Sequence, residues 1–88
     1  MAYKIEFTPA ARRQFRKLAP ETRKRLAPLI DSLASEPRPK GATLLSGSQR
    51  AYRVRHGDYR IIYELDDDRL LVLVIRIGHR REVYRGLS

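Results

Sequence analysis

Arginine is the residue type in this chain with the clearest capacity for chemistry. From residue 50 onward the basic side chains, histidine apart, are nine arginines and no lysine: Arg50, Arg53, Arg55, Arg60, Arg69, Arg76, Arg80, Arg81 and Arg85. A guanidinium group presents a planar fork of donors that matches phosphate oxygens, and it can stack on a nucleobase. It stays protonated in proteins, so it stabilises an anion well and accepts a proton poorly. The pattern favours binding of a phosphodiester.

A predicted hairpin brings several of these arginines together. A glycine at the first position of a two-residue loop suits a type II′ turn, so Gly57 and Asp58 predict a hairpin in which Arg55 faces Arg60. One face of this hairpin is then apolar and holds Tyr52, Val54, Tyr59, Ile61, Tyr63 and Leu65, while the other holds Arg53, Arg55, Arg60, Ile62 and Glu64. Like charges directly opposite each other destabilise a sheet, which favours a bound external anion. The alternative is a solvated face on which Glu64 and water relieve the repulsion.

Two side chains near the end of the last predicted strand, Tyr84 and His79, complete a set that could cleave RNA. Arginines beside them would stabilise the charge that develops on a pentavalent phosphorus. RNA supplies its own nucleophile, the 2′-hydroxyl, so neither a protein nucleophile nor a metal is needed. A general base is the missing part, because Arg53 and Arg55 stay protonated. His79 is the first choice for this role; His56 has the parity of the apolar face, and a lone histidine beside an arginine can also be a plain surface residue.

Composition narrows the class of protein. With 88 residues the chain is expected to form a single domain spanning 1–88. The net charge of +9 favours a phosphate backbone of RNA or DNA as the partner. The alternatives are an acidic protein as the partner, and a basic charge that serves only solubility. Cysteine is absent, and the acidic run 66–68 is expected to be the solvated cap of a hairpin and not a metal site. No apolar run reaches the roughly 20 residues that cross a bilayer, and no secretory pattern opens the chain, so a cytoplasmic protein is expected.

The elements that position these residues follow from the hydrophobic pattern. Residues 3–7 alternate as a half-buried strand, Thr8 and Pro9 begin a helix that runs to about residue 18, and Pro20 begins a second helix with an apolar stripe from 26 to 33. Three strands follow, of which the last, 70–77, is almost wholly apolar. The predicted order is β-α-α-β-β-β, an α+β domain with a helical hairpin packed on a mainly antiparallel four-stranded sheet. Three loop residues in the acidic turn would align even-numbered positions of the last two strands on one face; two or four would not.

Several stretches together resemble one family. The segments YRVR, GDYRIIYEL and GHRREVYR, with the ARRQFRKL run of the first helix, are similar to RelE toxins of the RelE/ParE toxin–antitoxin superfamily over nearly the whole chain. The resemblance implies a toxin that enters the ribosomal A site and inhibits translation by cleaving messenger RNA there. The implied chemistry is attack by the 2′-hydroxyl, which leaves a 2′,3′-cyclic phosphate and a 5′-hydroxyl without any cofactor.

The resemblance also implies roles for individual residues. Arg60 would steady the scissile phosphate, Arg80 would serve the leaving group or transition state, and Tyr84 would orient or stack on a base. Arg53 and Arg55 fall where well-studied members have lysines that take part in proton transfer and phosphate binding. The further candidates for RNA binding are Arg50, Arg76, Arg81 and Arg85.

The exchange of lysine for arginine is the main departure from the family pattern. Either another group is the base, with His79 the first choice, or catalysis relies on geometry imposed by the ribosome, in which case weak activity is expected. Two rival functions remain open: a ParE-like toxin that poisons DNA gyrase, and a non-catalytic basic module that binds RNA or an acidic protein. The family further implies a cognate antitoxin that covers the basic site. No membrane and no small-molecule cofactor are expected as partners.

Overall fold

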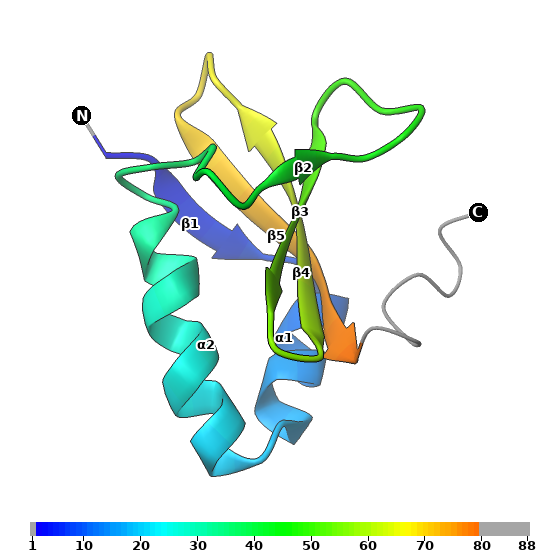
Figure 1. Cartoon of the computed structure of the whole chain (residues 1–88). Coiled ribbons are helices and arrows are strands. Elements are labelled where there is room, and N and C mark those ends of the chain that lie inside the picture. The colour runs from blue at the N-terminus through cyan, green and yellow to red at the C-terminus, as the bar shows by residue number, and fades with distance from the viewer. Residues whose placement is uncertain (1, 80–88) are drawn as a thin grey trace.

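The computed structural model describes residues 2–79 of the chain (Figure 1). Its elements are β1 (Lys4–Phe7), α1 (Pro9–Lys17), α2 (Pro20–Ser32), β2 (Thr43–Leu44), β3 (Ala51–His56), β4 (Tyr59–Asp66) and β5 (Leu71–His79). The sheet order is β1-β5-β4-β3-β2, in which β1 runs parallel to β5 and the other neighbours are antiparallel. The predicted α+β class and element order are confirmed. The sheet has five strands and not four, because the short β2 adds an edge strand beside β3.

Both helices begin where the sequence predicted. The Thr8 hydroxyl caps α1 by accepting from the amide of Ala11 at 3.1 Å, and Pro9 occupies the first helical position. No side chain caps α2, which starts at Pro20. Instead Arg23 of α2 donates to the carbonyl oxygens at the end of α1, and so fixes the angle between the two helices.

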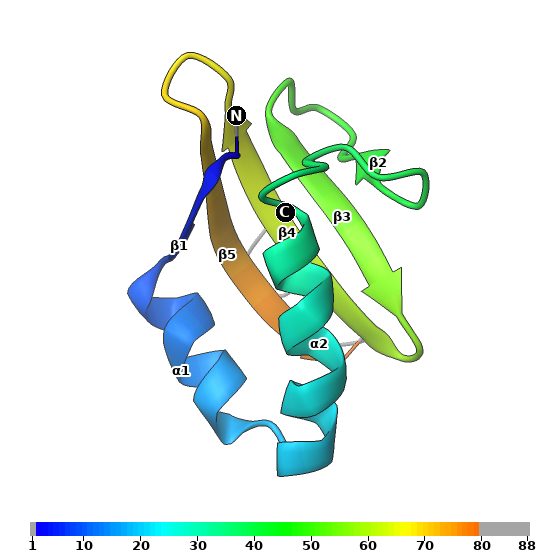
Figure 2. The same ribbon diagram turned by 90° about the vertical axis from the view of Figure 1, so that its left-hand side faces the viewer.

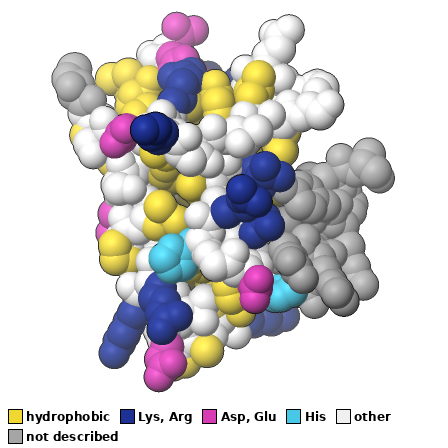
Figure 3. Space-filling model, in the orientation of Figure 1, with side chains coloured by type: hydrophobic (Ala, Val, Ile, Leu, Met, Phe, Trp, Pro, Cys, Tyr) yellow, Lys and Arg dark blue, Asp and Glu magenta, His cyan; other side chains and the backbone are white. Residues whose placement is uncertain are grey.

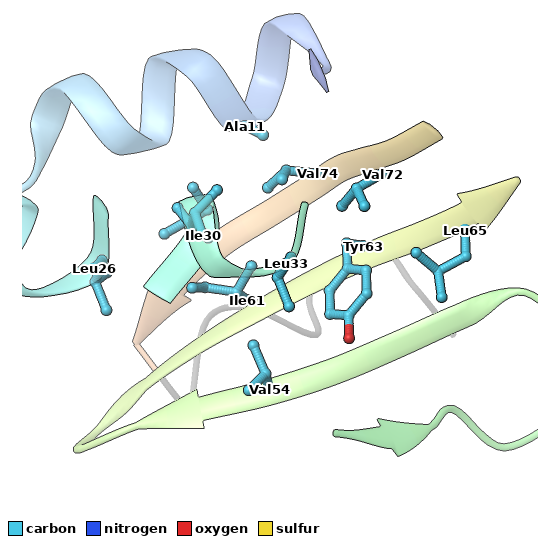
Figure 4. Close-up of a cluster of buried hydrophobic side chains, with 11 residues drawn as sticks. Ala11, Leu26, Ile30, Leu33, Val54, Ile61, Tyr63, Leu65, Val72 and Val74 are labelled. Carbon is cyan, nitrogen blue, oxygen red and sulfur yellow. The ribbon is translucent and has the colours of Figure 1, made fainter. Parts of the chain in front are cut away.

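Both helices lie over one face of the sheet, as Figure 2 shows. Their buried residues meet the inward side chains of β3, β4 and β5 in one core (Figure 4): Ala11, Leu26, Ile30, Leu33, Val54, Ile61, Tyr63, Leu65, Val72, Val74 and Ile77. Tyr52 and Tyr59, which the sequence also placed on the apolar face, pack against this core while remaining partly exposed. No helix within residues 2–79 covers the other face of the sheet, which we call the outer face.

The β3–β4 hairpin has the predicted register. His56 pairs with Tyr59 and Arg55 with Arg60 across a loop of Gly57 and Asp58. Gly57 has φ +61°, whereas Asp58 has negative φ, which is the pattern of a type II′ turn and excludes type I′. The turn chemistry therefore fixes which residues reach the outer face.

The length of the loop between β4 and β5 does not by itself predict which residues of the two strands share a face. Four loop residues, 67–70, separate the two strands, and by turn length alone their even-numbered residues would lie on opposite faces. The register shifts just after Ile62, which pairs with Arg76, and Ile75 is left as an extra residue of β5. This β-bulge restores the alignment of even-numbered residues beyond it. The prediction that turn length alone decides which face the end of β5 presents was therefore wrong, because the bulge decides it.

Side chains of the first helix continue the edge of β5 where β1 ends. The Thr8 hydroxyl donates to the carbonyl of Ile75 at 3.3 Å, and the Gln14 side-chain oxygen accepts from the amide of Ile77 at 2.8 Å. These bonds satisfy backbone groups that a longer β1 would otherwise have paired. They hold the end of β5 against α1.

An ionic clasp joins three segments at the β4–β5 turn. The Arg38 guanidinium binds both carboxylate oxygens of Asp67, with the shorter contact at 2.7 Å, and Tyr3 donates its hydroxyl to the same carboxylate. Arg38 also donates to the Tyr52 hydroxyl at 2.9 Å. The acidic run is therefore not only a solvated cap, since Asp67 anchors the loop between α2 and β2.

A buried tyrosine of β4 also anchors the loop between α2 and β2, from the core side. Tyr63 is fully buried, stacks on Tyr52 with ring centroids 5.8 Å apart, and donates its hydroxyl to the carbonyl of Pro37 at 2.7 Å. A buried hydroxyl needs such a partner, because an unsatisfied one costs free energy. Burial raises the pKa of this hydroxyl to about 12.

Asp67→Asn is expected to lower the melting temperature at pH 7, because the neutral amide cannot match the charge of Arg38. The hydrogen bonds from Arg38 and Tyr3 hold the pKa of Asp67 below its ordinary value of 3.8. A depressed pKa stabilises the folded state above the ordinary pKa, and that contribution is lost as the pH falls through the folded value. Thermal melts at pH 7 and about pH 2 should show the gap between parent and variant close in acid. Asp68→Asn removes the same charge without a clasp contact and is the control; an equal effect of both variants would contradict this role.

Tyr63→Phe is expected to lower the free energy of unfolding by about 1 kcal/mol, since it removes one buried hydrogen bond. Because the folded pKa of Tyr63 is raised, its contribution is complete below pH 10 and falls as the pH rises towards 12. Urea denaturation at pH 8 and pH 11 measures both effects. The variant should lose less stability than the parent between these pH values, and a larger loss in the variant would contradict the assignment.

Candidate functional site

The outer face carries the arginine cluster that the sequence predicted. Strand register brings together Arg53, Arg55, Arg60, Ile62 and Arg76, and we call this set the arginine face. β3 supplies the first two residues, β4 the next two and β5 the last. Arg76 was expected only as a residue that binds RNA, and the bulge after Ile62 is what places it here.

Arg55 and Arg60 lie directly opposite each other at the hairpin end of this face. Residues in such positions have Cβ atoms about 5 Å apart, so their charges repel. Arg60 turns part of its guanidinium towards the loop and donates to the carbonyls of Gly57 and Tyr59 at 3.4 and 3.3 Å. On its other side Arg60 faces Gly78, which has no side chain to crowd it. The remaining donors of Arg60 and the exposed Arg55 are therefore available to an anion.

An apolar residue separates the other two arginines. Ile62 pairs with Arg53 on one side and Arg76 on the other, and it is 0% exposed. Arg53 and Arg76 are half-buried, and the Nε atom of Arg53 is fully buried. Ile62 thus forms a floor between the arginine stems, a role that its position opposite Arg53 could have suggested. A dry floor strengthens the electrostatic attraction of these guanidinium groups for an anion.

The carboxylate on the same face does not neutralise the cluster. Glu64 lies two residues beyond Ile62, opposite Ala51 and Leu73, and makes no ion pair within residues 2–79. The ion pairs in this part of the chain lie at the opposite end of the sheet or on β1. The proposal that Glu64 relieves the repulsion therefore has no salt bridge to support it.

Neither histidine joins the arginine face. His79 pairs with Tyr59 and meets its ring edge-on, with centroids 6.1 Å apart, beside Lys17 at the end of α1 and Leu18 that follows it. His56 lies on the same helical side, beside α2. The strand register therefore separates the imidazole groups from the arginines by the thickness of the sheet, and a role for His79 as the base at this face is not favoured.

The remaining predicted site residues divide into two groups. Arg50 lies 3.7 Å from Asp66, an ion pair at the far end of the sheet from the hairpin. Arg80, Arg81, Tyr84 and Arg85 lie outside the described residues. Within residues 2–79 no group of His, Asp or Glu side chains could hold a metal ion, and no helix there is long and apolar enough to cross a membrane.

Known proteins are similar to this chain in both sequence and fold. A family model described as the ParE toxin of the type II toxin–antitoxin system parDE matches residues 5–84. Toxin RelG of Mycobacterium tuberculosis is 34% identical over 97% of this chain and 99% of its own, and mRNA interferase toxin RelE of Escherichia coli is 33% identical over 96% and 92%. A chain of the intact E. coli RelBE toxin–antitoxin complex superposes with a TM-score of 0.80 at 28% identity, over 89% of this chain and 96% of that chain. The similarity thus covers the arginine face and both helices.

Arg55→Glu is expected to stabilise the free protein by about 0.5 kcal/mol, or roughly 3 °C in melting temperature, because it replaces a repulsion across the hairpin by an attraction to Arg60. Thermal melts at low salt measure this change, which added salt should reduce. Lys40→Glu changes the net charge equally at an exposed loop position and is the control. Equal stabilisation by both variants would show that only net charge matters, and would remove the argument for a strained arginine pair.

Proposed function

Because the chain belongs to the RelE/ParE family of toxins from type II toxin–antitoxin systems, we propose that it is a ribosome-dependent endoribonuclease. It cleaves messenger RNA in the ribosomal A site and thereby inhibits translation. Its E. coli relative is named an mRNA interferase, which supports the choice of substrate.

The observation that carries this proposal is the arrangement of charge on the outer face. Arg55 and Arg60 oppose each other directly, and Arg53 and Arg76 flank a dry floor formed by Ile62. Within residues 2–79 no carboxylate forms an ion pair with Arg55, Arg60 or Arg76. Such a face is less stable without a polyanion than with one, and a phosphodiester fits the planar donor fork of arginine.

The reaction proposed for this face is an internal transfer within RNA. The 2′-oxygen attacks the adjacent phosphorus, the bond to the 5′-oxygen breaks, and the products are a 2′,3′-cyclic phosphate and a 5′-hydroxyl. The 2′-hydroxyl gives up a proton and the leaving 5′-oxygen takes one up, so no oxidant, metal or cofactor is consumed. Charge grows on the phosphoryl oxygens as phosphorus becomes pentavalent, and preorganised guanidinium groups lower the energy of that state.

The proposed roles follow the family pattern, residue by residue. Arg60 holds the scissile phosphate, with Arg53 and Arg55 as additional phosphate ligands. Arg80 stabilises the leaving group, and Tyr84 orients a base by stacking. The protein stabilises the charge of the transition state, and the ribosome aligns the 2′-oxygen for attack. This division follows because both histidines of the chain lie on the helical side, away from the arginines. Weak activity compared with relatives that carry lysines is the expected result.

The proposed partners are messenger RNA, the ribosome and a cognate antitoxin. Solved relatives include toxin–antitoxin complexes, which supports an antitoxin for this chain. An antitoxin that covers the arginine face would need acidic side chains to satisfy Arg55 and Arg60. Action on ribosomes places the toxin in the cytoplasm.

A DNA gyrase poison is the second candidate, because the matching family model is described as a ParE toxin. The combination of Arg60, Arg80 and Tyr84 is the feature that separates the two candidates, since ParE-like toxins generally lack this set. A protein without either activity, which only binds RNA, accommodates the arginines but does not require Tyr84.

Arg60→Ala, Arg80→Ala and Tyr84→Phe are each expected to reduce cleavage by about 10²–10³-fold, the usual effect of removing one group that stabilises a transition state. Primer extension on messenger RNA translated in a reconstituted system detects cuts within A-site codons. Arg69→Ala is the matched control, because its side chain is 81% exposed at the β4–β5 turn, away from the arginine face.

The outcomes distinguish the candidates. Cuts that require ribosomes and vanish in the three variants support the proposal, whereas full cleavage by all three variants would refute the assigned roles. Uncut message together with loss of gyrase supercoiling would establish the second candidate. Uncut message with gyrase unaffected would leave only a binding protein.

A further inference from the structure

A row of ring side chains crosses the sheet on its helical side, at the hairpin end. His56 of β3 pairs with Tyr59 of β4, and Tyr59 pairs with His79 of β5, so the three residues occupy neighbouring positions on one face. Adjacent strands are about 4.8 Å apart, so the row is roughly 10 Å long. Tyr59 is only partly buried and His56 is exposed, although both lie on the face that the helices cover elsewhere.

Two hollows flank the central ring of this row. One, of about 250 Å³, lies between Tyr59 and α1 and is lined also by Gln14, Lys17 and His79. The other, of about 280 Å³, lies between Tyr59 and α2 and is lined also by Thr22, Arg25, His56 and Asp58. Tyr59 is the wall that the two hollows share. A planar group that enters either hollow can therefore contact the Tyr59 ring.

The surroundings of these hollows are positively charged. Lys17 ends α1 and Arg25 lies on the first half of α2, and both are exposed. Between residues 12 and 25 the chain has seven Lys or Arg and a single acid, Glu21. Asp58 is the one carboxylate that lines either hollow. In Figure 3 dark blue side chains gather beside a histidine over the lower part of α2.

We propose that this surface, formed by Lys17, Arg25, His56, Tyr59 and His79, is a second binding site for single-stranded RNA. A base stacks on Tyr59, and Lys17 and Arg25 contact the neighbouring phosphates. The site lies on the opposite side of the sheet from the arginine face, so it binds a different stretch of RNA from the one that is cleaved. The proposal relies on the proposed function only for the choice of RNA as the polyanion.

Interleaved rings and cations favour RNA over an acidic protein as the occupant. Bases stack on an aromatic ring without regard to sequence, while the flanking cations follow the phosphate backbone. An acidic peptide would use the cations equally well but would gain little from a row of three rings. Loss of Tyr59 therefore separates the two partners, because only RNA depends on the ring.

Binding to a fluorescein-labelled single-stranded oligoribonucleotide of 12 nucleotides tests the proposal without ribosomes. The assay uses the full chain with Arg53→Gln, Arg55→Gln, Arg60→Gln and Arg76→Gln, which removes every positive charge of the arginine face. This background should keep salt-dependent binding, measured by fluorescence anisotropy. Adding Lys17→Gln with Arg25→Gln should weaken binding at least about 10-fold and flatten the plot of log K against log salt by about 1.4, the value for two phosphate contacts on a single strand.

Matched variants complete the design. Lys4→Gln with Lys40→Gln removes the same charge from positions outside both hollows and should change affinity less than about 2-fold. Tyr59→Leu should weaken binding about 5-fold or more, while Tyr59→Phe keeps the ring and should bind like the background. Circular dichroism and thermal melts of each variant exclude unfolding as the cause of any loss.

Three results would overturn the proposal. The first is a background that no longer binds the oligoribonucleotide, and the second is equal weakening by the two charge pairs. The third is a Tyr59→Leu variant that binds like the background while polyglutamate of equal length competes with RNA, which would assign the surface to an acidic protein. Because the assay contains no ribosome and detects no cleavage, failure of the nuclease proposal in primer extension leaves this test unaffected, and the reverse also holds.

Discussion

Successive side chains of a strand point to opposite faces, and this alternation in the central strands is the constraint on which the rest of the structure depends. Val54, Ile61, Tyr63 and Leu65 face the helices and are buried, so their neighbours along the strands are committed to the outer face. Without an extra residue, β5 would turn Arg76 into the core and Ile77 outward. The bulge at Ile75 prevents this: Ile77 is 2% exposed inside the core, and Arg76 lies half-buried on the outer face. One inserted residue therefore satisfies the core and the arginine face together.

The same sheet also keeps its opposite charges apart. Asp66 and Asp67 at the β4–β5 turn pair with arginines from the loops around them, whereas Arg55 and Arg60 face each other at the far end. Pairing these groups would have stabilised the fold, so their separation points to a requirement beyond folding. A surface with one sign of charge produces a field that draws a polyanion from a distance. Both histidines lie on the helical side of the sheet, so the positive charge that residues 2–79 place on this surface comes from arginines, which stay protonated.

Local signals account for what the sequence predicted correctly. Gly57 and Asp58 fix the hairpin register, and Thr8 with Pro9 fixes the start of α1, because each depends on neighbours within a few residues. The bulge could not be predicted, since the apolar run 70–77 has no two-residue period that would reveal a shift. His79 lies beyond this register shift, so the face of the sheet that it occupies could not be predicted either. The contact between Arg38 and Asp67 joins positions 29 residues apart and leaves no local pattern.

The clasp around Asp67 has a consequence for the order of folding. Tyr3 and Asp67 are 64 residues apart, so their contact closes a loop of most of the chain and carries a high entropic cost early in folding. The hairpin of β3 and β4 needs only a two-residue loop and can form first. A contact that is absent from the transition state slows unfolding without speeding folding. The clasp is therefore expected to lower the unfolding rate, and so to lengthen the time for which a folded molecule resists proteolysis.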